Sequence, residues 1–411
     1  MLPLEEIPST PLWRGFYAHN RLLRLYLLAS HIITRDLLFA SKNRSSTLSL
    51  GGLAPRRILV CNGAHLGDVV IASSALPVLR SRFPTAEIGF LCGSWAQELV
   101  KAHPLVNYVH VADHWVLNRS KLSLTRRIAR TVRTSLQSIS EIRRLKYDLS
   151  IDFYIFYPNL AEIPWAAGVP VRIGYGSGGF GAFFTHCFEL PFRLNAHMLD
   201  YHGYLLANLG CADEEVKKMR PSLDYLVRPL SQVKAAMNDG ESLEPGAYIV
   251  LHIGAGDPHK EWPVTNWRTV AAELCGQYKL VFTGRGRRES ELIAQVIDGL
   301  PNSINLCNRL DLSSFASVVS KARLVIGLDS VAVHIASALG VPSVALWSGI
   351  YPSLFKPRFG RCDVIIGSVP CVPCLRGCGE RECIRSVSAQ TVLARVNRAL
   401  EATSPDGLAK A

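Results

Sequence analysis

A carboxylate, a hydroxyl and an imidazole stand close together in the stretch GLDSVAVHIASALGVPSVALWSG, residues 327–349. The apolar run RLVIGL predicts a buried strand ending at Asp329, and Ser330 is a favoured N-cap for a following helix. Free N–H groups and the helix dipole make such a terminus a binding site for anions. His334, one turn further on, shares a face with Ser330. These residues form either a structural cap with a core histidine or a site for a diphosphate beside a sugar hydroxyl.

Three further loops at predicted strand ends carry groups suited to related chemistry. LHIGAGDPHKEWP offers Gly254, where the backbone can approach a phosphate, and Lys260, which supplies a point charge. FTGRGRRES places Glu289 at the start of a helix, where it either caps that helix or accepts hydrogen bonds from a sugar or ribose. HLGDVV places Asp68 at a strand-to-helix turn, as a cap or as a base that takes a proton from an acceptor hydroxyl.

The elements that must position these loops alternate between strand and helix. From Arg56 the order is strand RRILVCNG, a single helix DVVIASSALPVLRSRF, strand EIGFLCG, helix SWAQELVKAH, strand NYVHVAD, a long basic helix and strand YDLSIDFYI. A second series begins at Tyr248 and ends with strand PSVALW. Near-continuous apolar strands that alternate with helices predict a parallel sheet covered on both faces.

The chain is therefore predicted to form an α/β fold of two doubly wound, Rossmann-like domains facing a central cleft, the expected ligand site. The stretch 211–246 is charged and has few sheet signals, so the domain junction is expected near 230–246. The predicted parts are an N-terminal helix and linker, two domains, and a cysteine-rich segment with a terminal helix, over residues 1–55, 56–240, 241–370 and 371–411.

Composition narrows the classes of partner. The 411 residues are 48% hydrophobic and 19% charged, which excludes a disordered chain and suits two or more domains. A net charge of +12 indicates anionic partners: phosphorylated ligands, nucleic acid or an anionic membrane surface. No secretory signal and no run of about 18 apolar residues is visible, and the eleven cysteines are expected to be reduced in a cytoplasm.

Two basic segments suit such partners. Residues 11–40 predict a helix with its arginines in an arc of roughly 80°, lying either in a membrane interface or on the protein's own body. Residues 118–147 hold nine Lys or Arg against one Glu, as a solvated helix face or as a site for phosphate, carboxylate or membrane groups. The candidate acceptor-binding residues are Arg126, Arg127 and Arg130. Nucleic acid is not expected, because basic and aromatic residues do not alternate.

Four cysteines near the C-terminus have the spacing C-x2-C-x3-C-x4-C. A tetrahedral structural zinc ion and an iron–sulfur cluster are both compatible with this spacing. Free or redox-active thiols are the other interpretation. The cysteines are Cys371, Cys374, Cys378 and Cys383.

The chain resembles the ADP-heptose:lipopolysaccharide heptosyltransferases, glycosyltransferase family 9, over roughly residues 56–385. The resemblance lies in HLGDVVIASSALPVLRSRFPTAEIGFL, VRIGYG, HMLDYHGYLLANLG, LHIGAGDPHKEWPVTNW and GLDSVAVHIASALGVPSVALWSG, matched in order and spacing. It implies a GT-B fold with an acceptor domain first and a nucleotide-sugar domain second.

This resemblance implies roles for individual residues. The family's acid/base aspartate falls on Asp68 and its phosphate-binding lysine on Lys260. Val331 stands where the family has glycine, and its side chain crowds the backbone approach to a diphosphate. The donor-binding acidic residue and the Asp-Ser/Thr-Gly-x-x-His element fall on Glu289, Asp329, Ser330 and His334.

The implied reaction inverts the anomeric carbon and uses one base and no metal. Heptose or a related sugar would pass from a nucleotide-diphosphate donor such as ADP-heptose to a lipopolysaccharide core or another lipid-linked acceptor. The expected location is the cytoplasm, at the inner face of the membrane. Two alternatives stay open: a nucleotide-sugar epimerase, which can use the same two domains, and a non-catalytic sugar- or lipid-binding protein, which Val331 makes conceivable.

Overall fold

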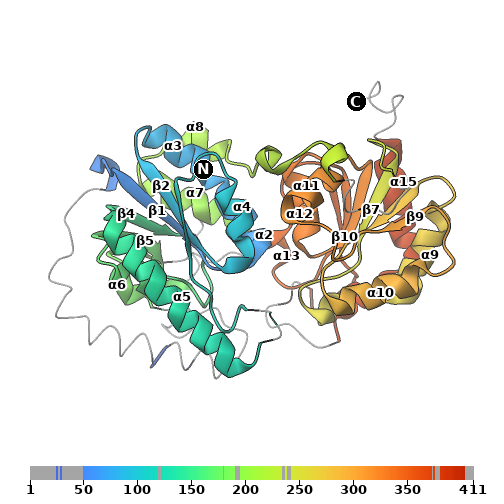
Figure 1. Cartoon of the computed structure of the whole chain (residues 1–411), viewed down its shortest axis with the longest axis horizontal. Helices are drawn as coiled ribbons and strands as arrows, with labels where there is room; N and C mark the ends of the chain where they lie inside the picture. Colours follow the sequence, from blue (N-terminus) through green and yellow to red (C-terminus); the bar gives the residue numbers. More distant parts are fainter. Residues whose placement is uncertain are drawn as a thin grey trace. The chain divides into compact units, whose positions relative to one another are not determined.

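The computed structural model describes residues 25, 28–29, 50–118, 120, 122–178, 180–189, 195–233, 237, 242–372, 374 and 380–402. Its internal contacts divide the chain into two compact units, Met1–Pro221 and Ser222–Ala411, and each is described by itself (Figure 1). Most of the helix predicted over 11–40 lies outside the described residues, and residues 25, 28 and 29 are helical. Within the described ranges, no helix combines the length and apolar character needed to cross a membrane.

The first unit is built on a parallel sheet of six strands in the order β3-β2-β1-β4-β5-β6. All of β4 and all but the first residue of β1 and β2 are buried, as coverage on both faces requires. The chain reverses its direction of winding between β1 and β4, where doubly wound sheets bind ligands. The strands are β1 Arg57–Asn62, β2 Glu87–Cys92, β3 Tyr108–Val111, β4 Leu149–Asp152, β5 Val171–Tyr175 and β6 His186–Phe188.

Helices cover both faces of this sheet. In Figure 1, α3, α7 and α8 lie on one side of the strands, and α5 and α6 lie on the other. The helices are α2 Leu66–Ser73, α3 Ala75–Arg82, α4 Gln97–Lys101, α5 Leu124–Leu145, α6 Glu162–Ala166, α7 Met198–Asn208 and α8 Asp213–Lys217.

The single helix predicted from Asp68 onward is wrong, because the structure divides it into α2 and α3 at Ser74. Pro77 lies in the first turn of α3 and has no N–H group to bond the carbonyl of Ser73. The Ser74 hydroxyl instead donates to the carbonyl of Ile71 at 2.6 Å. The proline therefore outweighs the continuous apolar periodicity of this segment.

The second unit repeats the topology of the first, with strand order β12-β11-β10-β7-β8-β9, all parallel. Its switch point lies between β7 and β10, so the loops that follow these two strands meet at one edge. The strands are β7 Tyr248–His252, β8 Lys279–Phe282, β9 Ser303–Asn305, β10 Leu324–Leu328, β11 Ser343–Leu346 and β12 Cys362–Ile365.

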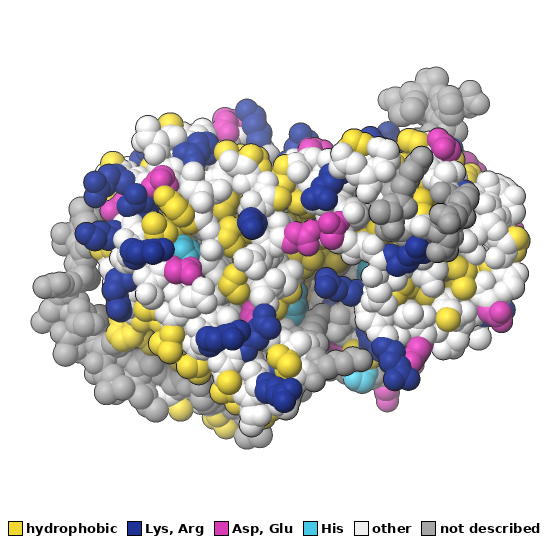
Figure 2. Space-filling view, viewed as in Figure 1, with side chains coloured by type: hydrophobic (Ala, Val, Ile, Leu, Met, Phe, Trp, Pro, Cys, Tyr) yellow, Lys and Arg dark blue, Asp and Glu magenta, His cyan; other side chains and the backbone are white. Residues whose placement is uncertain are grey.

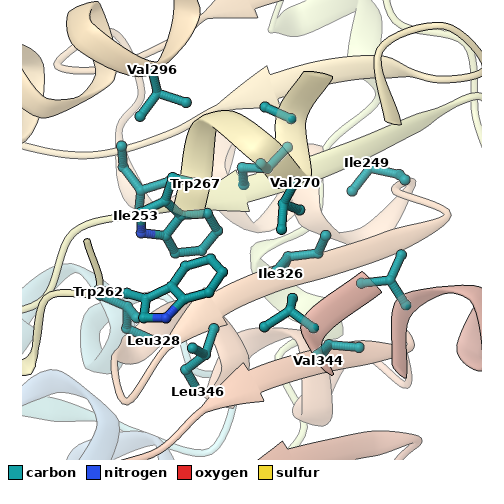
Figure 3. Packing of buried hydrophobic residues seen from close by; sticks show 14 of the residues in the cluster. Ile249, Ile253, Trp262, Trp267, Val270, Val296, Ile326, Leu328, Val344 and Leu346 are labelled. Atoms are coloured by element: carbon teal, nitrogen blue, oxygen red, sulfur yellow. The ribbon is translucent and has the colours of Figure 1, made fainter. Parts of the chain in front are cut away.

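The core of the second unit anchors the loop after β7. Figure 3 shows the indole rings of Trp262 and Trp267 packed beside Leu328 and Leu346. The two rings meet edge to face, with centroids 5.1 Å apart, and the Trp262 indole N–H donates to the carbonyl of Val387 at 2.8 Å. The helices are α9 Val264–Leu274, α10 Arg287–Ile297, α11 Leu312–Ser320, α12 Val331–Ala338, α13 Pro352–Phe355, α14 Glu382–Arg385 and α15 Ala389–Glu401.

The division between the units falls at residues 221 and 222, before the junction expected from the sequence near 230–246. The segments 224–226 and 230–232 contact α11 of the second unit. Between them, the Arg228 N–H donates to Ser317 Oγ at 2.7 Å. These contacts assign the connecting stretch to the second unit. The binding roles named for the two domains stay predictions.

Candidate functional site

The second unit brings together side chains that follow three neighbouring strands. Lys260 Nζ lies 2.7 Å from Asp329 Oδ2, and the Ser348 hydroxyl donates to the same carboxylate oxygen at 2.9 Å. Lys260 lies in the loop after β7, Asp329 follows β10 and Ser348 follows β11. An ammonium group has three N–H donors, so Lys260 can serve Asp329 and an anionic ligand together. Ser348 was not predicted as a site residue. Its position directly after a predicted strand next to β10 could have indicated that role.

Helix α12 begins directly after this cluster. Ser330 occupies the predicted N-cap position with extended backbone, but its side chain makes no capping hydrogen bond. Its Oγ is buried and has no hydrogen-bond partner among the residues that the structure describes. Burying a hydroxyl without a partner costs free energy, and a ligand oxygen bound at this terminus would remove that cost. The start of α12 therefore has the properties of an anion site, with Val331 as its first helical residue.

His334 lies one turn into α12 and is buried against Trp347, with ring centroids 5.8 Å apart and planes at 73°. Burial lowers the pKa of His334 to about 4, although the neighbouring Asp329 carboxylate opposes this shift. The imidazole is therefore neutral near pH 7. This packing corresponds to the core-histidine interpretation, and a donor contact by His334 stays a prediction.

Gly254 lies against the side chain of Glu289. A Cβ atom on Gly254 would stand 2.2 Å from Glu289 Cδ, far inside contact distance. Glu289 is the third residue of α10 and accepts the Arg285 N–H at 2.8 Å, which satisfies a backbone donor at the helix start. Burial raises the pKa of the Glu289 carboxyl group. The capping role of Glu289 is thus observed, and its contact with a sugar or ribose stays a prediction.

We expect the substitution Gly254→Ala to destabilise the second unit by about 1–3 kcal/mol, because the new methyl group must displace the Glu289 side chain. Thermal unfolding followed by circular dichroism measures the effect. Gly276→Ala is the matched control, because no atom lies within 4 Å of a Cβ at that position. Equal melting temperatures for the two variants would show that Glu289 moves aside without cost.

Two arginines that were not among the predicted site residues contact the loop after β7. Arg288 donates to a backbone carbonyl of this loop and lies 3.1 Å from Glu261. Arg381 Nη2 lies 3.3 Å from Asp257 Oδ2, across 124 residues of sequence. The position of Arg288 in an arginine-rich turn after β8 is a weak signal, and no local pattern links Arg381 to its partner.

In the first unit, Asp68 belongs to a capping box at the start of α2. Its Oδ2 accepts the His65 N–H at 3.1 Å. Because β1 ends at residue 62, this box stands at the switch point beside β4. The same arrangement recurs at the start of α7, where Asp200 Oδ2 accepts the His197 N–H at 2.8 Å. The capping role of Asp68 is thus observed, and its role as a base stays a prediction.

Two of the three candidate acceptor-binding arginines are engaged within their own unit. Arg130 forms an ion pair with the buried carboxylate of Asp113. Arg127 Nη1 donates to the carbonyl of Trp115 at 3.3 Å. Arg126 is exposed and forms no ion pair with any residue in the described part of the chain. Acceptor binding stays a prediction for all three.

The cysteine motif is described in part, because Cys378 lies outside the described residues. Cys371 is exposed, Cys374 is half-buried, and the buried Cys383 accepts the Gly349 N–H through its Sγ at 3.2 Å. Among the described side chains, no group of three His, Cys, Asp or Glu residues is arranged to hold a metal ion. As described, these three cysteines do not form a metal site, and a zinc or iron–sulfur site stays a prediction.

Comparison with known proteins identifies relatives along most of the chain. A family model described as glycosyltransferase family 9 (heptosyltransferase) matches residues 136–384, more than half of the chain. Lipopolysaccharide heptosyltransferase 1 of Pseudomonas aeruginosa is 34% identical over 136 residues, covering 32% of this chain and 38% of that protein. Lipooligosaccharide heptosyltransferase 2 of Haemophilus ducreyi is 24% identical over 328 residues, covering 75% of this chain and 88% of that protein.

The same relationship is visible in the fold. The solved structure of the E. coli ADP-heptose lps heptosyltransferase II matches with a TM-score of 0.64 and 19% identity, covering 84% of this chain and 98% of that chain. At this identity the likeness concerns the fold alone. Together with the two doubly wound units, it confirms the predicted α/β fold of GT-B type.

Proposed function

The chain belongs to glycosyltransferase family 9 and is a glycosyltransferase, and from this premise we propose that it transfers a heptose from ADP-heptose to a lipopolysaccharide core. The observation that carries the proposal is the cluster at the start of α12, in which Lys260 pairs with Asp329 beside the Ser330 hydroxyl, which has no hydrogen-bond partner among the described residues. Relatives named as heptosyltransferases support the choice of sugar. The structural neighbour named for ADP-heptose supports the choice of donor.

The proposed role of the second unit is to bind the donor and stabilise its leaving group. When a nucleoside diphosphate departs, negative charge develops on its oxygens. The Lys260 ammonium and the N–H groups at the start of α12 stabilise this charge without a catalytic metal. Asp329 holds Lys260, and Ser348 holds Asp329, so the cation is in place before the donor arrives. Glu289 is a proposed partner for the sugar or ribose hydroxyls.

The proposed role of the first unit is to bind the acceptor and remove its proton. Inversion at the anomeric carbon needs one base, which accepts the hydroxyl proton while the new C–O bond forms and the bond to the diphosphate breaks. Asp68 is the proposed base, because its carboxylate lies at the switch point of this unit. Arg126, Arg127 and Arg130 would bind phosphate or carboxylate groups of the acceptor. A lipid-linked acceptor would place the enzyme in the cytoplasm at the inner membrane surface.

A donor screen tests the reaction. The purified chain is incubated with ADP-heptose, ADP-glucose or UDP-N-acetylglucosamine in the presence of EDTA, with and without a heptose-free lipopolysaccharide acceptor. We expect mass spectrometry to show addition of one heptose to the acceptor from ADP-heptose alone, with inverted configuration by NMR. Interconversion of a nucleotide sugar without acceptor would indicate an epimerase. Binding without turnover would indicate a non-catalytic protein, and a requirement for added metal would overturn the metal-independent mechanism.

A further inference from the structure

Helix α5 carries a row of exposed apolar side chains. Leu124 is 49% exposed, Ile128 44%, Val132 52% and Leu136 62%. The spacing of four residues places them along one continuous ridge of the helix. Single apolar residues on a surface are ordinary, whereas a contiguous apolar patch marks an interaction site.

Two other exposed apolar side chains of this unit, Trp115 and Trp165, lie near the same helix. Trp115 precedes α5 and is held beside its first turns by the bond from Arg127 to the Trp115 carbonyl. Trp165 lies in α6, which is held beside the last turns by a bond of 2.6 Å from Arg143 to the Ala166 carbonyl. An exposed tryptophan thus stands near each end of α5. Tryptophan is favoured at membrane–water interfaces because its ring is apolar and its N–H is polar.

Basic side chains run beside this apolar ridge. At about 100° per residue, Arg126, Arg133 and Arg144 point within roughly 20° of one another, on the solvent side of the ridge. Arg126 and Arg133 form no ion pair within the described part of the chain. The one acidic residue of α5, Glu141, is engaged by His110 at 2.9 Å. Figure 2 shows dark-blue and yellow side chains in the same region at the lower left, where α5 lies.

We propose that the α5 ridge docks on an anionic phospholipid bilayer. The leucine, isoleucine and valine side chains would enter the boundary between headgroups and acyl chains, and the arginines would contact lipid phosphates. Charge decides between the possible occupants. A second copy of the ridge would bring arginines against arginines, and like charges repel. Residues 11–40 would be repelled in the same way, because they contain four arginines and one aspartate. The proposal goes beyond the sugar-transfer reaction, because it predicts that α5 binds a phospholipid surface that contains no sugar acceptor.

Vesicle binding by the full chain tests this surface. Vesicles of phosphatidylcholine, with or without an equal part of phosphatidylglycerol and free of lipopolysaccharide, are sedimented with the protein. We expect wild type to bind the phosphatidylglycerol vesicles and to be released by salt. Val132→Ser combined with Leu136→Ser, and Arg126→Glu combined with Arg133→Glu, should each weaken binding about tenfold or more.

Two matched controls accompany these variants. Ala129→Ser adds a hydroxyl to another exposed position of α5, and Lys218→Glu with Arg220→Glu makes the same charge change elsewhere on the first unit. Both controls should bind as wild type does. Because all the substituted side chains are exposed, the melting temperatures of the α5 variants should match that of wild type.

Several results would overturn the proposal. Absence of wild-type binding, or unchanged binding by both α5 variants, would assign membrane contact to another segment or to none. A wild-type dimer that becomes a monomer in the serine variant, with vesicle binding retained, would make the ridge a contact between copies. If the α5 variants lost sugar transfer to a water-soluble acceptor but still bound vesicles, the ridge would instead be part of the acceptor site.

Discussion

Replacing Asp68 by asparagine is expected to lower the rate of sugar transfer by roughly 10²–10⁴-fold and to leave the affinity for ADP unchanged. Asparagine keeps the size of the side chain and an oxygen that can accept the His65 N–H, but it cannot take up the acceptor proton. The values of kcat and kcat/KM should fall together, because the lost interaction is made only in the transition state. Steady-state kinetics and calorimetric titration with ADP measure the two quantities.

The chain contains a matched control for this substitution. Asp200 occupies the same third position of a second histidine-capped helix in the same unit. Asp200→Asn changes that helix start in the same chemical way, at a cost in stability of about 1 kcal/mol or less, and should largely retain transfer. If the two variants lost transfer equally at equal stability, helix capping would explain the effect, and Asp68 would not be the base.

The substitution Lys260→Met is expected to weaken ADP binding by about 10–100-fold and to lower kcat/KM by at least as much. The variant loses the cation that would bind the diphosphate, and it leaves the Asp329 carboxylate, still held by Ser348, to repel the ligand. Lys279→Met is the matched control. Lys279 is the first residue of β8, whereas the site loops follow the last residues of the strands, and its ammonium group donates to the Ser242 carbonyl. This control should bind ADP as wild type does.

A double variant separates two explanations for the Lys260 effect. If Lys260 only neutralises Asp329, then Lys260→Met combined with Asp329→Asn removes both charges and should restore ADP binding. If Lys260 contacts the diphosphate, the double variant should still bind ADP about tenfold more weakly than wild type or worse. We expect the second result. Recovery of near wild-type affinity would reduce Lys260 to a partner of Asp329.

The order of strands and helices could be predicted because its signals act between residues close in sequence. The apolar runs that became β7 and β10, and the serine at the N-cap of α12, report hydrogen-bonding patterns within a few positions. The prediction failed at Pro77, where apolar periodicity was weighed and the missing proline N–H was not. The hydroxyl of Ser330 was also expected to cap its helix, but it is buried and forms no hydrogen bond with any residue that the structure describes.

The sequence by itself determined the alternation of strand and helix, and therefore the loops at strand ends that carry Asp68, Lys260 and Asp329. Only the tertiary structure decided which of these groups meet. Lys260 and Asp329 are 69 residues apart and pair because β7 and β10 are neighbours at the switch point of their sheet. The tertiary structure also left the apolar ridge of α5 uncovered. Burial depends on which other elements pack over a side chain, and that information is spread over the whole chain rather than held in any local pattern.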